Sequence, residues 1–268
     1  MNIQTYIVDA FTDRAFTGNP AGVCLLEKPI SAELMQSIAL ELNLSETAFL
    51  LNLEKHSYSI RFFTPHIEID FCGHATMASA KIVLDKVALE EVRFTTSQKL
   101  HLIGRYADNA IKMVFPMYDT VVYEPEQEVY DALGVGEPIT TRLSKDLDML
   151  LIEVLDKRTL LEISPLYEKL IKSSANLKEV VITCKSEDEG FDFYSRCFAP
   201  WLGINEDPVT GAAHSVLAKY WSDKLGVSEM SAYQLSKRGG FLKLTILSDM
   251  ALEVRSNAKI IFEGKLIV

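Results

Sequence analysis

The sequence has few cysteines, few turn-forming residues and no long apolar segment. Its cysteines, Cys24, Cys72, Cys184 and Cys197, form no CxxC pair, and a chain of 268 residues does not need disulfides to fold. We therefore expect reduced thiols and a cytoplasmic protein. With 13 glycines and 9 prolines, no long disordered tail is predicted. No apolar run approaches the roughly 20 residues that cross a bilayer, and the N-terminal MNIQTYIVDAF lacks the pattern of a signal peptide.

Basic residues and nucleotide-binding motifs are also scarce. The chain has 27 Lys and Arg against 37 Asp and Glu, a formal net charge of −10. A nucleic-acid backbone would be repelled, so we expect no nucleic-acid partner and no membrane. The absence of GxSxG, a P-loop and GxGxxG leaves nucleophilic hydrolysis, kinase chemistry and nicotinamide hydride transfer without support. Small anions remain possible ligands, because a local group of backbone N–H groups can hold them.

Alternating and β-branched segments predict a chain rich in strands. Candidate strands cover residues 2–10, 21–26, 45–52, 58–65, 67–71, 92–97, 99–106, 110–116, 147–155, 179–184 and 191–200, with several short ones in 242–268. Helices are predicted after a Ser31 cap, over residues 75–86 and 165–174, and after the turn that begins at Asp207.

The two halves of the chain have a similar order of predicted elements. DFCGHATMASA in the first half matches DPVTGAAHSVLA in the second, with Asp, Gly, Ala and His near a helix start in both. A boundary falls near Pro116, before the acidic stretch YEPEQEVYDALG. We predict two like domains, residues 1–116 and 117–268, each with strands around one buried helix. This prediction leaves open whether the last strand of the chain returns to the first domain.

The candidate site residues each have a functional and a structural interpretation. Glu46 lies among apolar residues, and burial would raise its pKa and suit it to exchange a proton near neutral pH. It would otherwise be a solvent-facing strand residue or serve Asn43 as a cap. His74 is either a structural histidine or a proton carrier or substrate donor. Asp207 either forms the turn before Pro208 or orients a substrate amine or hydroxyl.

The helix starts and the thiol complete the set of candidates. Gly73 and Gly211 precede helices whose first N–H groups can bind an anion, or they mark ordinary loop-to-helix junctions. Cys72 and His74 together suggest a metal. A zinc site needs three or four ligands, and no second Cys/His cluster stands at suitable spacing, so no metal is expected.

Several motifs in order carry a resemblance to a known family. FTDRAFTGNPAGVCLL, LNLSETAFL, IRFFTPHIEIDFCGHATMASA, EDPVTGAAH and SKRGG cover nearly the whole chain. The set resembles the phenazine-biosynthesis PhzF-like family, within the diaminopimelate epimerase-like fold. The resemblance implies an α+β fold of two pseudo-symmetric domains, each a mostly antiparallel, barrel-like sheet around a central helix, with the site in the cleft between them. It also implies a cofactor-independent isomerase, usually a homodimer, that acts on a small carboxylate-bearing substrate.

The resemblance also implies roles for individual residues. The family's acid/base glutamate matches Glu46, its cleft histidine matches His74, and its aspartate matches Asp207. The expected substrate-binding residues are Asn19, Gly73, Ala75, Gly211 and Ala212. In the best-characterised family activity, which isomerises a dihydro-hydroxyanthranilate, a glutamate would take a proton from one ring carbon and return it to another.

Two departures from family patterns keep alternatives open. The family often has TGSAH where this chain has TGAAH, so Ala212 lacks a hydroxyl and the substrate's identity is left open. Related epimerases use two cysteines, and here Cys72 precedes Gly73 but Thr210 precedes Gly211. A racemase or epimerase that uses Cys72 is therefore an alternative, and so is a non-catalytic protein that binds a small ligand.

Overall fold

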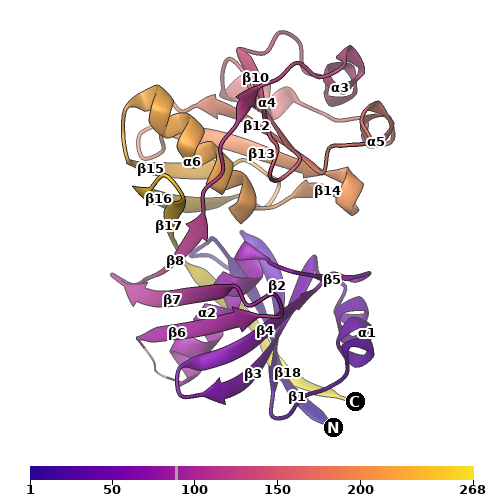
Figure 1. Cartoon of the computed structure of the whole chain (residues 1–268), viewed down its shortest axis with the longest axis vertical. Coiled ribbons are helices and arrows are strands. Elements are labelled where there is room, and N and C mark those ends of the chain that lie inside the picture. The colour runs from indigo at the N-terminus through magenta and orange to yellow at the C-terminus, as the bar shows by residue number, and fades with distance from the viewer. Residues whose placement is uncertain (88–89) are drawn as a thin grey trace. The chain divides into compact units, whose positions relative to one another are not determined.

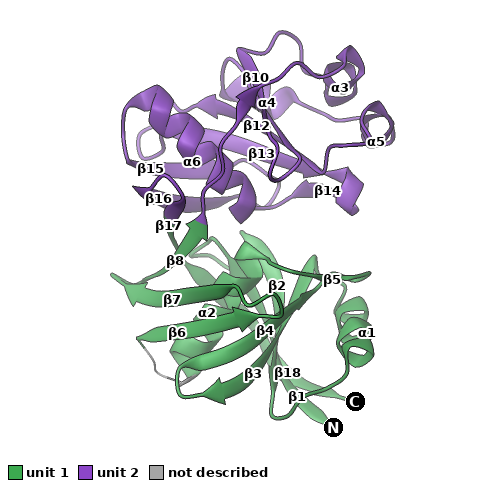
Figure 2. Ribbon diagram, viewed as in Figure 1, with its two compact units in different colours: residues 1–115, 253–268 green, residues 116–252 purple. Residues whose placement is uncertain are grey.

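The computed structural model describes residues 1–87 and 90–268, with elements labelled in Figure 1. The chain divides into two compact units, coloured separately in Figure 2. Unit 1 comprises Met1–Phe115 and Glu253–Val268, and unit 2 comprises Pro116–Leu252. The chain therefore leaves unit 1, builds unit 2, and returns to unit 1 with its C-terminal segment.

Strands make up most of both units. The strands that begin in unit 1 are β1 (Asn2–Ala10), β2 (Asn19–Leu26), β3 (Glu46–Glu54), β4 (Ser57–Phe63), β5 (Glu68–Ile69), β6 (Glu91–Thr96), β7 (His101–Ala107), β8 (Ala110–Pro116) and β18 (Ala258–Ile267). Those that begin in unit 2 are β9 (Val121–Val122), β10 (Thr140–Ser144), β11 (Met149–Glu153), β12 (Glu179–Lys185), β13 (Phe193–Ala199), β14 (Ile204–Asp207), β15 (Glu229–Gln234), β16 (Gly240–Ser248) and β17 (Ala251–Ser256). The helices are α1 (Ala32–Leu42) and α2 (Gly73–Val87) in unit 1, and α3 (Gln127–Leu133), α4 (Lys157–Glu162), α5 (Tyr167–Ser173), the 3₁₀ helix η1 (Pro200–Leu202) and α6 (Gly211–Leu225) in unit 2.

The two units use the same order of strand pairing. In unit 1, β18, β1 and β2 are antiparallel neighbours, β2 pairs in parallel with β3, β3 antiparallel with β4, β4 in parallel with β6, and β6 antiparallel with β7. In unit 2, the same sequence of pairings runs through β9, β10, β11, β12, β13, β15 and β16. A short strand before the longest helix, β5 or β14, pairs antiparallel with β4 or β13. The described strands are all joined in one 18-stranded sheet, within which each unit repeats the same, mostly antiparallel pairing order.

Helix α2 is the central helix of unit 1. It contacts β1, β2, β3, β6, β7 and β18, and every residue from Cys72 to Ala80 is buried. A helix surrounded on all sides has little room for long side chains, which explains its run of Ala, Thr, Met and Ser. Gly104 on β7 shows how close the sheet lies, because a Cβ at that position would be 2.8 Å from the Cβ of Ala80.

Helix α6 has the corresponding place in unit 2. It follows β14 and precedes β15, as α2 follows β5 and precedes β6. Its residues 213–218 are all buried. Trp221 is fully buried and stacks on Phe193 of β13, with ring centroids 5.6 Å apart. The two helices with small-residue starts therefore both belong to the cores of their units.

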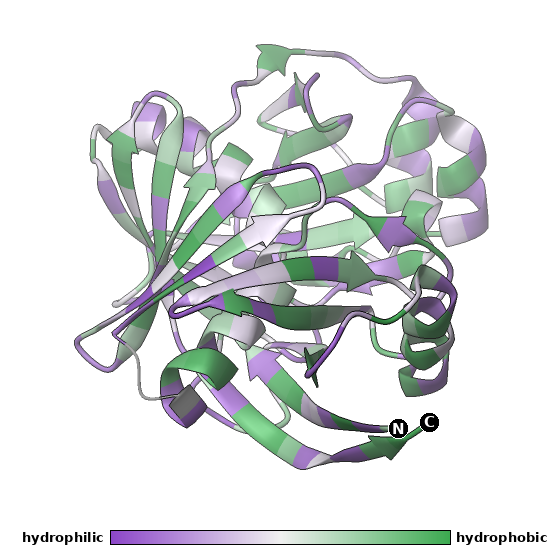
Figure 3. Cartoon of the chain, turned by 60° about the horizontal axis from the view of Figure 1, so that its bottom comes forward, coloured by the Kyte–Doolittle hydropathy of each residue, from purple (hydrophilic) through white to green (hydrophobic). Residues whose placement is uncertain are grey.

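Local sequence patterns located most elements and missed several short ones. Ser31 caps α1 by accepting a hydrogen bond from the Leu34 N–H, as predicted. Hydrophobic and hydrophilic bands alternate along the strands in Figure 3, as in the burial patterns of β6 and β15. Helix α3 lies in the acidic stretch that the sequence analysis used as a boundary, and α4, β10 and β15 were not predicted. Among residues 1–87 and 90–268, no helix combines the length and the apolar character needed to cross a bilayer.

Candidate active site

Glu46 opens strand β3 and carries a buried carboxylate. Helix α1 ends at Leu42, and its C-cap, Asn43, has a φ of 49° that turns the chain toward the strand. Glu46 then pairs with Ala21 at the start of the parallel β2–β3 contact. Only 8% of the surface of Glu46 is exposed, so the prediction of a sheltered carboxylate is confirmed. The alternative of a solvent-facing strand residue is excluded.

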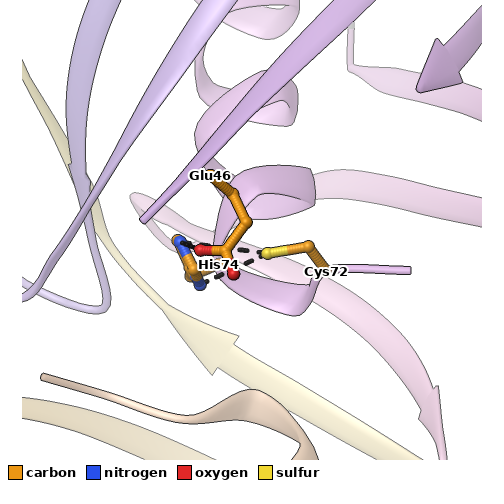
Figure 4. A group of neighbouring side chains, drawn as sticks. All are labelled: Glu46, Cys72 and His74. Carbon is orange, nitrogen blue, oxygen red and sulfur yellow. Dashed lines mark hydrogen bonds and ion pairs between the residues drawn. The ribbon is translucent and has the colours of Figure 1, made fainter. Parts of the chain in front are cut away.

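His74 lies at the start of α2 and meets Glu46 directly. Figure 4 shows the side chains of Glu46, Cys72 and His74 pointing toward one another. The Nε2 atom of His74 is 3.0 Å from Oε2 of Glu46. Oε2 is buried and has no partner in hydrogen-bond geometry among the described residues. We therefore describe its contact with Nε2 of His74 as an ion pair. The same ring lies 3.3 Å from Nδ2 of Asn19 and 3.4 Å from Oγ of Ser45.

The ion pair sets the charge of both groups. Burial alone would raise the pKa of Glu46, but the charge and close contact of His74 and the Ser45 hydroxyl outweigh it and lower that pKa. The prediction of a raised pKa was therefore wrong, because it considered burial without the imidazole. Burial would lower the pKa of His74, but the contacts with Cys72 and with the Glu46 carboxylate outweigh it and raise that pKa well above the ordinary value. At neutral pH the pair is a carboxylate and an imidazolium.

Cys72 adds a thiol to the same group. Its Sγ lies 3.4 Å from Nδ1 and 3.8 Å from Nε2 of His74. Burial raises the pKa of this thiol despite the nearby imidazolium and the Ala75 N–H. Glu46 is thus the partner that carries negative charge next to His74, while Cys72 remains a thiol. Thr76 fixes the turn by donating from its backbone N–H and its Oγ1 to the Cys72 carbonyl.

Asn19 reaches the ring from the turn that opens β2. The preceding residue, Gly18, has a φ of +70°, and a Cβ there would lie 2.2 Å from the carbonyl oxygen of Ala10. Only glycine tolerates both the positive φ and the close approach of this carbonyl, which explains why glycine precedes Asn19 in the GNP motif. The turn is held further by the Asp9 carboxylate, which accepts the Phe16 N–H at 2.7 Å.

The predicted site residues fall into one group in each unit. Unit 1 brings together Asn19, Glu46 and His74, with Gly73 and Ala75 in the first turn of α2. Ala75 is fully buried, and its backbone N–H is directed at the Cys72 thiol. Unit 2 carries the remaining predicted residues, Asp207, Gly211 and Ala212. The substrate-binding roles and the location in a cleft stay predictions.

Asp207 belongs to a hydrogen-bonded group at the start of α6. Its carboxylate accepts a hydrogen bond from the Thr210 hydroxyl. The Gln234 amide joins both residues, because its Nε2 donates to the Asp207 carbonyl at 2.7 Å and its Oε1 accepts the Thr210 N–H at 3.0 Å. Sequence reasoning missed both Gln234 and Ser45. Gln234 stands in no motif, and Ser45 lies in the SETAF motif, where only its neighbour Glu46 was considered.

The histidine of the second motif differs from His74 in charge. His214 is fully buried, its Nδ1 donates to the Thr210 carbonyl at 2.7 Å, and its ring stacks on Phe193. Burial lowers the pKa of His214 to about 4, so the ring is neutral. Nε2 has no hydrogen-bond partner among the described residues. His214 therefore supports the core of unit 2.

Comparisons with known proteins identify relatives along the full chain. The family model described as "phenazine biosynthesis-like protein" (PhzC-PhzF) matches residues 8–264. The human phenazine biosynthesis-like domain-containing protein is 39% identical over 286 aligned residues, covering 99% of each chain. An uncharacterised isomerase of Halalkalibacterium halodurans is 42% identical over 258 residues, covering 93% of each.

Solved structures share the fold. The crystal structure of a phenazine biosynthesis protein of the PhzF family from Enterococcus faecalis matches with a TM-score of 0.90 and 36% identity over all of both chains. A hydroxyproline epimerase from Agrobacterium vitis, with bound trans-4-hydroxy-L-proline, matches with a TM-score of 0.62 at 10% identity, over 99% of this chain and 92% of that one. The first match confirms the predicted fold class, and the second shows a likeness of fold alone.

Proposed function

Because this chain belongs to the phenazine biosynthesis-like (PhzF) family, we propose that it is a cofactor-independent isomerase that moves a proton on a small carboxylate-bearing substrate. An isomerase-type role is supported by relatives named as isomerases. The fold is shared with proteins described as epimerases and racemases. The buried Glu46–His74 pair is the single observation that carries the proposal.

Glu46 would carry the proton. Its carboxylate forms an O–H bond as a substrate C–H bond breaks, and the O–H bond then breaks as a C–H bond forms at another carbon, so atoms and electrons balance without a cofactor. The lowered pKa of Glu46 makes it a weak base toward carbon. The proposal therefore favours a substrate whose C–H bond is already acidic, next to a conjugated or carbonyl-bearing system.

His74 and the helix starts would hold the substrate. The imidazolium lies 3.0 Å from the Glu46 carboxylate and keeps it ionised before the reaction. It would donate to a substrate oxygen once the carboxylate takes up a proton. The N–H groups at the starts of α2 and α6 favour a carboxylate. Asp207, just before α6, would orient an amine or hydroxyl of the substrate.

We also propose that the protein acts as a cytoplasmic homodimer.

Deuterium uptake tests the role of Glu46. The protein is incubated in D₂O with a dihydro-hydroxyanthranilate and a panel of small amino and hydroxy acids, and mass spectrometry follows incorporation at carbon. Glu46→Gln keeps the size of the side chain and removes its basicity, so uptake should fall by about 10²–10⁴-fold. Glu54→Gln is the matched control, because Glu54 is an exposed glutamate on the same strand. Undiminished uptake by Glu46→Gln, or no labelling of any compound by the wild type, would contradict the proposal.

A racemase or epimerase that uses Cys72 is the second candidate, favoured by the 3.4 Å contact between Sγ and His74 Nδ1. Burial raises the pKa of the thiol, so at neutral pH it stays protonated and little thiolate is available to act as a base. The corresponding position before α6 is Thr210, whose hydroxyl is hydrogen-bonded to Asp207. Cys72→Ala separates the two candidates. It should retain deuterium uptake if Glu46 carries the proton and lose it if the thiol does.

A further inference from the structure

Three different metal-binding side chains meet at one place in unit 1. Glu46, Cys72 and His74 each offer one ligand atom, and these atoms lie within 4.8 Å of one another. In the part of the chain that the structure describes, this is the one such group of three. We propose that the three side chains form a binding site for a zinc-class divalent cation, with a fourth coordination position left open. The proposal concerns binding of the metal and stands without the proposed isomerase function.

The donor set has the chemistry that zinc selects. Thiolate sulfur, imidazole nitrogen and carboxylate oxygen are its ordinary protein ligands, and three of them with an open position form a common arrangement. All three residues are buried, each with less than a tenth of its surface exposed. Oxygen Oε2 of Glu46 is buried, and its ion-pair partner is the His74 ring 3.0 Å away. When Nε2 of that ring binds the metal and gives up its proton, the carboxylate needs another positive partner, which the cation supplies.

The distances allow the ion with small movements. A tetrahedral zinc ion at about 2.0–2.3 Å from each donor atom holds those atoms roughly 3.2–3.8 Å apart. In the structure, Nε2 of His74 lies 3.0 Å from Oε2 of Glu46 and 3.8 Å from Sγ of Cys72. The carboxylate would move away from Nε2 by a few tenths of an ångström. The thiol and the carboxylate, whose ligand atoms lie within 4.8 Å of each other, would approach by up to about 1 Å.

Neighbouring groups would support the ligands. With Nε2 bound to the metal, Nδ1 carries the proton and donates, and Asn19 lies 3.3 Å from it. A flip of the Asn19 amide turns its oxygen toward that proton, which orients the ring as second-layer acceptors do in known zinc sites. Coordination needs the Cys72 thiolate and a neutral His74 ring, so two protons, one from the thiol and one from Nε2 of the imidazolium, pass to solvent when the cation binds.

Binding of the cation would occupy the carboxylate that is proposed to move protons. A metal ion held by Glu46 and His74 leaves no free basic oxygen for a substrate C–H bond. Zinc should therefore inhibit the proposed isomerisation, whereas it would leave the fold intact. The sequence analysis did not find this donor set, because Glu46 opens β3 whereas Cys72 and His74 lie at the start of α2, and no spacing pattern connects them.

Metal titration tests the site directly. The full-length protein is freed of metal with EDTA, dialysed, and titrated with ZnCl₂ in a calorimeter. Parallel samples receive CoCl₂, whose thiolate charge-transfer band and tetrahedral visible bands report sulfur in the coordination sphere. We expect one ion per chain and a thiolate band. Cys72→Ser should remove the band and weaken binding by at least about 100-fold, because a direct ligand is lost.

Matched controls decide between this site and others. Cys24→Ser changes another buried thiol of unit 1, and His101→Asn changes an exposed histidine of the same unit. Both should bind zinc as the wild type does, and circular dichroism checks that every variant is folded. The proposal is overturned if the wild type binds no ion, if Cys72→Ser binds as tightly as the wild type, or if His101→Asn abolishes binding. These readouts need no substrate, so they remain interpretable if deuterium uptake fails.

Discussion

Acid should destabilise unit 2 through His214. The ring is fully buried, and Nδ1 must carry the proton that it donates to the Thr210 carbonyl at 2.7 Å. Nε2 therefore holds a lone pair with no partner among the described residues. Adding a proton there would place a cation in an apolar core, next to the stacked ring of Phe193. The folded state resists this protonation, whereas the unfolded chain accepts it freely.

The size and sign of the effect follow from the pKa. Burial lowers the pKa of His214 from 6.5 to about 4, and each tenfold change in proton affinity is worth about 1.4 kcal/mol. Above pH 6.5 both states are neutral and nothing is lost. As the pH falls toward 4 the unfolded state binds more protons, so the free energy of unfolding decreases, by about 3 kcal/mol in all. Between pH 7.5 and pH 5 the loss is about 2 kcal/mol.

Urea unfolding at pH 7.5, 6 and 5 measures this loss in the wild type and in His214→Phe. Tryptophan fluorescence reports on unit 2, because both tryptophans, Trp201 and Trp221, belong to it. Phenylalanine keeps the stacking on Phe193, and the backbone N–H of residue 214 still serves the Thr210 carbonyl. The variant should lose about 2 kcal/mol less than the wild type between pH 7.5 and pH 5. An equal loss in both proteins would refute the reasoning, whatever the variant's stability at pH 7.5.

Two further predictions concern the supports of the candidate site. Gly18→Ala forces a side chain into a left-handed turn against the Ala10 carbonyl, so we expect a loss of more than about 2 kcal/mol in urea unfolding, and an unchanged midpoint would contradict it. Gln234→Leu leaves the buried Thr210 N–H without its acceptor and removes a donor to the Asp207 carbonyl. It should cost about 1–3 kcal/mol, and faster hydrogen exchange at the Thr210 amide should accompany the loss.

Much of the fold could be predicted because local physics and tertiary structure agree in it. Ser31 satisfies an orphan N–H of α1, and the small residues of α2 match a helix that strands surround. Helix α3 was missed because its acidic sequence has no serine, threonine or asparagine cap, and its N-cap, Glu126, makes no side-chain hydrogen bond. Short elements of this kind are held by packing on the rest of unit 2, which a local pattern does not contain.

The sequence predicted which residues form the candidate site, but it did not predict their charges. Motifs pointed to Glu46 and His74 separately, and only the fold brings a strand start and a helix start within 3.0 Å. Burial considered alone gave the wrong sign for the Glu46 pKa, because the deciding term is a neighbour from another element. Gln234 has no local signal, since its role exists only where β15 passes the start of α6.

The two units share the same order of strands and helices, but they carry different chemical groups at corresponding positions. Glu46 opens β3 and meets an imidazolium, whereas Glu179 opens β12 and accepts the thiol of Cys197. The residue before α2 is Cys72, and the residue before α6 is Thr210. A two-base racemase needs comparable proton carriers from both halves, and these positions do not provide a matched pair. The unequal groups fit the proposed reaction instead, in which one carboxylate, Glu46, both removes and returns the proton and no matching base is needed at Thr210.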